Sequence, residues 1–393
     1  MKPTPIPTLP ERAARRVLLV QAFESGATEN ARWSAEDRAW ATRLARDTTP
    51  AGAAPERFLY ERSLHALQRL APRDAALHRL FTRRVWRWAW VALALLLGLL
   101  GGLAVNAIGG GQRVNLLAPP VWALIAWNLL VYGSLLLPVP RVARRWLKQR
   151  LLGYSTVGSA LESPLARFRV AWARQASSLL GARAALLLHV AAAALAGGLI
   201  AGLYVRGLVL DYRAGWQSTF LEPTQVRAWL ATLLAPAVAL TGIGVPDASA
   251  LQALRVAPDA LPVASAARWI HLYAAMLGLF VVLPRTVLAL VAARRARKLT
   301  RRLPLALGDP YFQRLLLEHQ GKSARVQVLP HGTAPLPQAR ACLQAVLGSA
   351  LGSGVQLSVA PATAYGNEDA AAALLPASGT TLRVALVDLS ATP

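Results

Sequence analysis

Four apolar stretches, each of a length suited to crossing a lipid bilayer, constrain this chain more than any other feature. They are residues 85–105, 116–137, 182–204 and 266–293. At about 1.5 Å per helical residue, each is long enough for the roughly 30 Å of a hydrocarbon core. The pattern predicts a mainly α-helical integral membrane protein with four transmembrane helices and a small cytoplasmic α/β domain at its C-terminal end.

The positive charge of the chain is concentrated beside these stretches. The formal net charge is +24 over 393 residues, which invites a nucleic-acid interpretation. However, the loop 138–181 alone carries eight Lys/Arg against one acid, and six basic residues lie within 294–302, whereas 303–393 carries five of each sign. Basic clusters at span ends are typical of cytoplasmic anchors on anionic lipid. We therefore expect a bilayer with anionic headgroups, and no nucleic acid, as a partner.

The distribution of charge also predicts a topology. The loop 106–115 has one Arg, and the loop 205–265 has four Arg and four acids. By the positive-inside rule, residues 1–84, 138–181 and 294–393 lie in the cytoplasm, with both termini, and 205–265 forms an outer loop.

One apolar segment of that outer loop does not fit a span. Residues 226–242 are interrupted by Pro236, and a crossing here would place the basic residues after the fourth span outside. We expect a surface-lying or re-entrant helix with Thr224 as its N-cap, and the sequence does not decide between the two placements. Trp216, Trp229 and Trp269 are expected at the outer headgroups.

The N-terminal region 1–84 is predicted to be helical and cytoplasmic. Its helices are expected over 11–24, from the capping box Ser34-Ala-Glu-Asp37 to 46, and over 56–70. Between the second and third spans, Leu165, Phe168 and Trp172 share one helical face. That helix is predicted either to lie in the inner headgroup region or to extend the third span.

The segment 294–393 is predicted to be a basic juxtamembrane stretch followed by an α/β domain with a partly parallel sheet. The expected helices are 311–319 and 337–347, and the expected strands are 325–329, 355–360 and 382–387. Because the chain ends shortly after the last strand, we expect either a truncated domain or a partner that covers the open sheet.

Four glycines suggest contact between the first and third spans. Gly98 with Gly102, and Gly198 with Gly202, have the small-xxx-small spacing that lets helix backbones approach closely. The alternative is the ordinary enrichment of glycine in membrane helices.

Arg285 and two histidines are titratable residues in the interior of the spans. Arg285 is a candidate functional residue, although its side chain is near enough to the inner end to extend toward the headgroups. His189 and His271 are the others. No span contains Asp or Glu, so we interpret both histidines as satisfied buried residues rather than a proton relay.

The outer stretch 211–221 mixes aromatic, charged and hydroxyl groups. Its candidate functional residues are Tyr212, Arg213 and Trp216. They are predicted either to anchor the outer loop to headgroups, the favoured interpretation, or to form a ligand-facing rim.

Motifs for catalysis and cofactors are missing. The single Cys342 excludes an internal disulfide or a cysteine-based metal cluster within one chain. Gly321-Lys-Ser323 is not a P-loop, because the earlier glycine position is Leu316. We therefore expect no cofactor, no metal and no identifiable catalytic residues.

Several segments resemble a known family. They are Tyr212–Leu221, Trp269–Tyr273, Leu279–Arg285 and Val387–Pro393. Together they resemble the bacterial inner-membrane family catalogued as domain of unknown function 2868. The resemblance implies a multi-span inner-membrane protein without an established activity. Members are often encoded beside a predicted GTPase, which implies a cytoplasmic GTPase as a candidate partner, and relatives continue past the terminal Ala-Thr-Pro.

Three functions follow as hypotheses. The first is a membrane-anchored scaffold or receptor for a cytoplasmic partner such as a GTPase. The second is a component of a homo-oligomeric transporter or channel, for which Asn128, His189 and Arg285 within the spans give only thin support. The third is an enzyme with its site in the outer loop around Asp211, Arg213 and Glu222.

Overall fold

The chain divides into two compact units in a computed structural model. Unit 1 comprises residues 1–83, 154–176 and 299–393, and unit 2 comprises 84–153 and 177–298. The structure describes residues 8–25, 33–50, 52–73, 86–108, 113–117, 119–136, 163–255, 265–320, 325–351, 355–364, 366–367 and 382–387. The basic residues 141–150, the rejected motif 321–323 and the terminal residues 388–393 lie outside this description.

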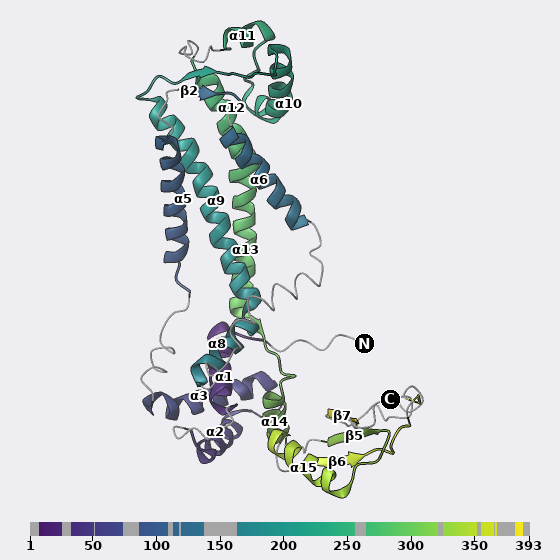
Figure 1. The fold of residues 1–393 in the computed structure, drawn as a ribbon. Helices are drawn as coiled ribbons and strands as arrows, with labels where there is room; N and C mark the ends of the chain where they lie inside the picture. The colour runs from purple at the N-terminus through teal and green to yellow at the C-terminus, as the bar shows by residue number, and fades with distance from the viewer. Residues whose placement is uncertain are drawn as a thin grey trace. The chain divides into compact units, whose positions relative to one another are not determined.

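Unit 2 is built on apolar helices. They are α5 (Ala89–Ile108), α6 (Pro119–Leu136), α9 (Ser177–Gly207) and a continuous helix of α12 (Ala267–Leu277), the π-helix η3 (Gly278–Val282) and α13 (Leu283–Arg301). Figure 1 shows α5 alongside α9. These helices cover the residues of the four predicted spans, because an almost unbroken apolar sequence favours a helix with apolar surroundings.

Two of the helices are long and apolar enough to cross a membrane. They are the 31-residue α9 and the 35-residue helix Ala267–Arg301. The apolar parts of α5 and α6, Ala89–Val105 and Trp122–Leu135, are shorter.

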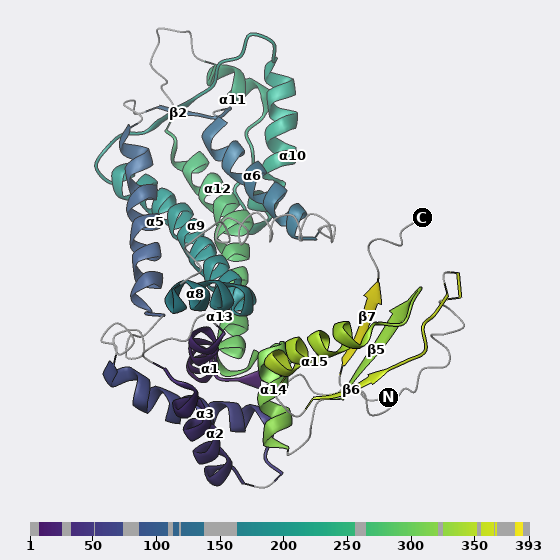
Figure 2. The ribbon, with the colours of Figure 1, turned by 60° about the horizontal axis from the view of Figure 1, so that its bottom comes forward.

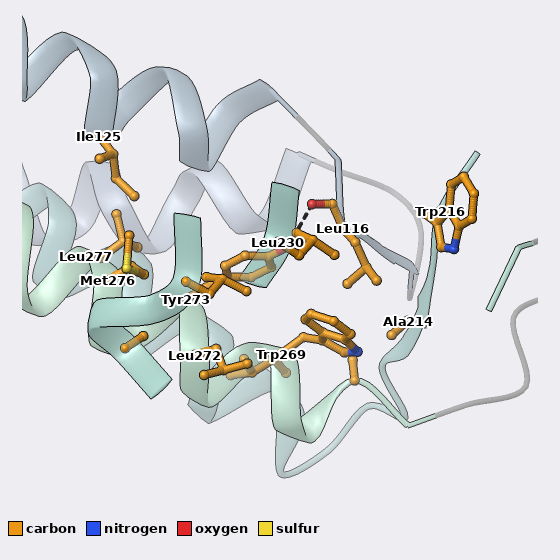
Figure 3. Close-up of a cluster of buried hydrophobic side chains, with 14 of the residues drawn as sticks. Leu116, Ile125, Ala214, Trp216, Leu230, Trp269, Leu272, Tyr273, Met276 and Leu277 are labelled. Carbon is orange, nitrogen blue, oxygen red and sulfur yellow. Dashed lines mark hydrogen bonds between the residues drawn. The ribbon is translucent and has the colours of Figure 1, made fainter. Parts of the chain in front are cut away.

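The outer-loop residues form a small folded cap within unit 2. Strand β2 (Arg113–Asn115) pairs in parallel with β3 (Arg213–Gly215), and helices α10 (Pro223–Thr241) and α11 (Ala248–Ala253) follow. Helix α10 packs against α12. Figure 3 shows the shared core, in which the Tyr273 hydroxyl donates to the Leu116 carbonyl at 2.8 Å.

Two predictions about this cap are wrong. The N-cap of α10 is Glu222 rather than Thr224: Pro223 occupies the first turn, and Glu222 and Gln225 form a reciprocal capping box. Trp216 and Trp269 are core residues rather than headgroup anchors, since both are almost fully buried. The indole of Trp216 donates to the Leu251 carbonyl at 2.8 Å, which satisfies its polar edge inside the protein.

Unit 1 contains the predicted N-terminal helices. They are α1 (Glu11–Glu24), α2 (Ala35–Thr48) and α3 (Pro55–Leu70), followed by the short η1 (Ala71–Arg73). The predicted capping box is confirmed: the Ser34 hydroxyl accepts from the Asp37 amide at 3.2 Å, and the Asp37 carboxylate accepts from the Ser34 amide at 3.3 Å. Strand β1 (Thr8–Leu9) pairs antiparallel with β4 (Leu303–Pro304).

Helix α8 (Pro164–Gln175) is not an extension of the third span, and its placement in the inner headgroup region stays a prediction. It ends at Gln175, and α9 begins as a new helix at Ser177. Its apolar face packs on α1, with Phe168 buried and the Arg167 Nε donating to the Ala22 carbonyl at 2.9 Å. Phe168 is therefore covered by protein rather than by headgroups.

The C-terminal part of unit 1 is the predicted α/β domain. After α14 (Pro310–His319), it contains β5 (Arg325–His331), α15 (Pro337–Leu351), β6 (Gln356–Val359) and β7 (Leu382–Val387). The strand order is β6-β5-β7, and both pairings are parallel. Figure 2 shows α15 beside the sheet, as expected for the crossover between parallel strands β5 and β6. Val326 and Val328 on central β5 are buried.

Candidate functional site

A buried arginine joins three helices of unit 2. Arg285 lies in the first turn of α13 and is only 7% exposed. Its Nε donates to the Asn128 side-chain oxygen on α6 at 2.7 Å, and its Nη1 lies 3.1 Å from His189 Nδ1 on α9. The guanidinium carbon lies 5.4 Å from the centre of the Tyr132 ring. We call Arg285, Asn128, His189 and Tyr132 the Arg285 cluster.

The backbone before Arg285 explains how the cluster is positioned. Proline has no N–H, so Pro284 cannot donate to the carbonyl of Phe280 four residues earlier. The chain passes this point as the π-helix η3, a form that often marks functional positions within long helices. The Tyr132 hydroxyl donates to the Phe280 carbonyl at 3.1 Å, which ties α6 to the irregular turn.

The groups that contact the charged guanidinium of Arg285 are neutral. A guanidinium remains protonated in proteins, and none of the four predicted spans contains an acid. The guanidinium therefore contacts an amide oxygen, a histidine nitrogen and the face of an aromatic ring. If His189 Nδ1 accepts from Arg285, its ring is neutral and its proton is on Nε2. These dipoles replace part of the hydration that burial removes.

The sequence singled out some members of this cluster and missed another. Arg285, His189 and Asn128 were named, and the structure brings them together; Arg285 is buried among helices rather than extended toward a helix end. Tyr132 was missed, although its position one turn after Asn128 was a usable signal. His271 lies elsewhere, and its interpretation as a buried residue is wrong: it is exposed, and its Nδ1 is 2.7 Å from the Tyr204 hydroxyl.

The four glycines lie where α5 meets α9. A methyl group added at Gly98, Gly102 or Gly198 would overlap backbone atoms of the facing helix, and Gly202 is buried on α9. The missing side chains therefore allow direct backbone contact. By contrast, a methyl group at the neighbouring Gly101 would meet nothing within 4 Å.

The outer-loop candidates do not form a closed site. Arg213 pairs with Asp211, and both side chains are substantially exposed. Glu222 instead faces Arg255 at 3.9 Å, again with exposed side chains. The Tyr212 carbonyl accepts from the Ala266 amide at 2.9 Å, a structural contact. This arrangement gives no support to an enzyme in the outer loop.

Unit 1 also holds a buried arginine, Arg62, which the sequence did not reveal. The Arg62 Nη2 on α3 donates to both Glu24 carboxylate oxygens on α1, at 3.0 and 3.1 Å. Glu24 also accepts from the Tyr311 hydroxyl at 2.8 Å and from the Trp33 indole at 2.9 Å. The Arg62 Nε donates to the Thr42 hydroxyl at 2.9 Å. We call these five residues the Glu24–Arg62 network.

The electrostatics of this network are those of a tight, dry ion pair. Burial alone would lower the pKa of Arg62, but its interactions with Tyr311 and the Glu24 carboxylate outweigh burial, and the pKa is raised above its ordinary value. Burial, followed by the nearby Glu24 carboxylate, raises the pKa of Tyr311. Both residues therefore keep their protons, and the network joins α1, α3 and α14 as a structural tie.

No group of three or more His, Cys, Asp or Glu side chains suited to a metal ion occurs among the described residues. The fold and these clusters define a mainly helical protein with two helices long and apolar enough to cross a membrane, and with a small parallel sheet near its C-terminal end.

Comparison with known proteins supplies the family. The model of the family described as "Protein of unknown function (DUF2868)" matches residues 152–387, more than half of the chain. The chain belongs to this family. No curated protein and no solved structure matches it.

Proposed function

We propose that this protein is a four-span membrane protein, of the bacterial inner membrane, that anchors a cytoplasmic docking unit for a partner protein. One observation carries the membrane part of the proposal. The apolar helices of unit 2 present large apolar side chains outward. Those exposed by half or more include Leu95, Leu96, Leu97 and Leu100 on α5, Trp127, Leu130 and Leu135 on α6, Leu188 on α9, and Leu283, Leu290 and Val291 on α13.

A surface of this kind is costly in water and favourable in lipid. Each Å² of apolar surface exposed to water costs about 25 cal/mol relative to an apolar environment. Helices α9 and Ala267–Arg301 are long and apolar enough to cross a membrane. We propose that α5 and α6, which extend about 30 Å and about 27 Å, cross beside them.

Two contacts between arginine and tryptophan support the proposal that α5, α9 and α13 meet the inner membrane surface at the same level. The guanidinium of Arg183 lies 5.0 Å from the Trp86 ring, and that of Arg297 lies 5.7 Å from the Trp88 ring. Tryptophan and arginine both favour the headgroup region. We place this end on the cytoplasmic side because the basic residues 294–302 follow it.

Site-directed labelling tests the topology. In a Cys342→Ser background, Arg302→Cys and Gln252→Cys would be treated with a membrane-impermeant maleimide in intact cells and in inverted vesicles. We expect Gln252→Cys to react in intact cells and Arg302→Cys only in inverted vesicles. Reaction of both from the same side would contradict the proposal.

The docking part of the proposal is supported by the sheet of unit 1. Strands β6 and β7 are the outer strands of the described three-stranded sheet. An outer strand offers backbone N–H and C=O groups to a partner's strand. We propose a cytoplasmic protein as the partner, and the family resemblance makes a GTPase the first candidate.

Photo-crosslinking tests the docking surface. A benzophenone amino acid would replace Val387, a half-exposed residue on β7, and Ala339, an exposed residue on α15, would be the matched control. We expect one adduct of defined mass from the Val387 position and none from Ala339. Absence of an adduct from β7, or equal adducts from both positions, would contradict a partner at this edge.

The Arg285 cluster favours a second candidate function, that of an oligomeric transporter or channel for anions. A buried guanidinium within apolar helices is a default functional candidate. Chloride flux into liposomes would be compared for the unmodified protein, Arg285→Lys and Arg285→Ala. Flux that survives in Arg285→Lys and is lost in Arg285→Ala would support transport, and absence of flux in the unmodified protein would exclude it for this ion.

A further inference from the structure

Helix α10 is apolar on its buried side and also on the adjacent exposed side. One side, with Val226, Leu230 and Leu234, is buried in the core shared with α12. The other side exposes Trp229 and Leu240, the latter by 67%. No charged residue occurs from 228 to 246. A helix that is apolar around its whole circumference is typical of an environment without water.

Two neighbouring turns share this property. Leu208 and Val209 follow the end of α9 and are 88% and 83% exposed. Phe220, shortly before α10, is 91% exposed. Isolated exposed apolar residues are ordinary, but here several bulky ones occur in one small cap. We call Leu208, Val209, Phe220, Trp229, Leu233 and Leu240 the outer apolar rim.

The path of the chain shows that α10 does not cross a membrane by itself. The Trp216 amide, before α10, donates to the Leu254 carbonyl, after α11, at 3.1 Å. The segment between them therefore leaves and returns at the same place. The ends of α10 are polar, with Glu222 at its N-cap and Asp247 beyond its C-terminal Gly242. Gly242 ends the helix in the left-handed conformation, with φ 72°.

The position of the rim relative to the candidate spans indicates what covers it. Leu208 and Val209 directly continue the long apolar helix α9, and α10 packs on α12, the first part of the other long apolar helix. Tyr204 near the end of α9 lies 2.7 Å from His271 on α12, so these two helix ends are at one level. Parts of the rim thus adjoin the ends of the two long apolar helices.

From this geometry we infer that the outer apolar rim is a lipid-binding surface: α10 lies in the outer leaflet, at the boundary between headgroups and acyl chains. The polar ends of α10 reach the headgroups, and Trp229, Leu233 and Leu240 contact hydrocarbon, as in helices that lie in a membrane surface. The inference rests on the four-span proposal. Of the two placements that the sequence leaves open, surface-lying and re-entrant, the inference favours the first, a shallow helix that does not cross the membrane.

Fluorescence quenching in vesicles tests the inference. Single cysteines at Leu233, Leu240, Gln252 and Leu130 would be introduced into full-length Cys342→Ser protein, labelled with the environment-sensitive dye NBD and reconstituted in phosphatidylcholine–phosphatidylglycerol vesicles. Gln252, exposed on α11, is the water-facing control, and Leu130 on α6 is the span control. Quenching by shallow nitroxide lipids and by aqueous iodide would be compared.

We expect nitroxide lipid to quench NBD at 233 and 240 at least about twofold more than at 252, and iodide to show the reverse order. Iodide quenching at 233 and 240 equal to that at 252, with lipid quenching retained at 130, would overturn the inference and leave the four-span proposal intact. Shielding of 233 and 240 from both quenchers would overturn it in favour of a protein partner. Loss of lipid quenching at 130 as well would overturn both proposals.

Discussion

Two of the buried arginines in the described part of the chain, Arg62 and Arg285, are held in opposite ways. In unit 1, Arg62 faces the carboxylate of Glu24, which also accepts from Tyr311 and Trp33. In unit 2, Arg285 faces only neutral groups, Asn128, His189 and the Tyr132 ring. The comparison teaches that a buried cation does not need a counter-charge when preformed dipoles surround it. It also predicts different responses to the same kind of substitution.

The largest expected effect is in the Glu24–Arg62 network. Arg62→Ala leaves the Glu24 carboxylate buried without its cation, which should cost about 3–5 kcal/mol in the free energy of unfolding. Hydrogen exchange at the amides of α1 and α3 measures this loss. Replacing the pair together, as Glu24→Gln with Arg62→Met, should cost less than Arg62→Ala alone.

The exposed Arg57 on the same helix is the matched control. Arg57→Ala should change the unfolding free energy of α3 by less than about 0.5 kcal/mol. Equal losses for Arg57→Ala and Arg62→Ala would show that the buried ion pair does not hold unit 1 together.

The second prediction concerns the glycines between α5 and α9. Close backbone packing stabilises this helix contact in unit 2, whereas a buried ion pair stabilises the helix contacts of unit 1. Gly102→Leu places a side chain against the backbone of α9 and should destabilise the α5–α9 contact by about 1–3 kcal/mol. Thermal melting in mild detergent measures it. Gly101→Leu is the control, because the space beside Gly101 is open. Identical melting temperatures for the two variants would disprove the role of Gly102.

The third prediction tests the neutral surroundings of Arg285. Asn128→Leu removes an acceptor and leaves the guanidinium in place, which should cost about 1–3 kcal/mol. Arg285→Met removes the charge itself and leaves only neutral groups, and should cost about 1 kcal/mol or less. Detergent melting of the two variants gives their order. A larger loss for Arg285→Met would mean that Arg285 has an anionic partner.

The smallest expected effect is a difference in acid sensitivity. Hydrogen bonds from Arg73, and to a lesser degree from Ser34 and Arg69, hold the pKa of Asp37 well below its ordinary value, although burial opposes them. Because the folded pKa lies below the unfolded one, the carboxylate stabilises α2 above about pH 4, and this contribution is lost as pH falls further.

Native-state hydrogen exchange of α2 measures this pH dependence. Protection should decline from about pH 5 downward, and Asp37→Asn should flatten the decline. The amides of α6 and α13, which border a cluster without acids, should change less over the same interval. An equal decline in α2 and α13 would contradict the assignment to Asp37.

Much of the fold followed from local patterns in the sequence. The amphipathic period of α1, the capping box of α2 and the alternation of β5 are set by neighbouring residues, and their bounds were predicted to within a few residues. The N-cap of α10 was mispredicted because two residues gave different signals. The hydroxyl of Thr224 is typical of an N-cap, but Pro223 is typical of the first helical position and places the N-cap at Glu222. Local sequence signals predict the residue at which a helix begins only when they all indicate the same residue.

The sites were harder to predict than the elements. Glu24, Arg62 and Tyr311 are separated by long stretches of chain and resemble ordinary surface residues of amphipathic helices, so no pattern marked their contact. Arg285 stood out because a charge within an apolar stretch is rare, but its partners did not. Trp216 carried the signal of a membrane boundary and is instead a core residue of the cap.

The sequence by itself determined where the apolar helices lie, which ends carry positive charge and which segments form the small parallel sheet. These properties depend on hydrophobicity and local propensity, which act on each segment separately. Only the tertiary structure decided which neutral dipoles surround Arg285, which carboxylate meets Arg62 and which side of α10 remains uncovered. Such contacts arise between segments distant in the chain, and their energies depend on distance and burial, which one segment's sequence does not specify.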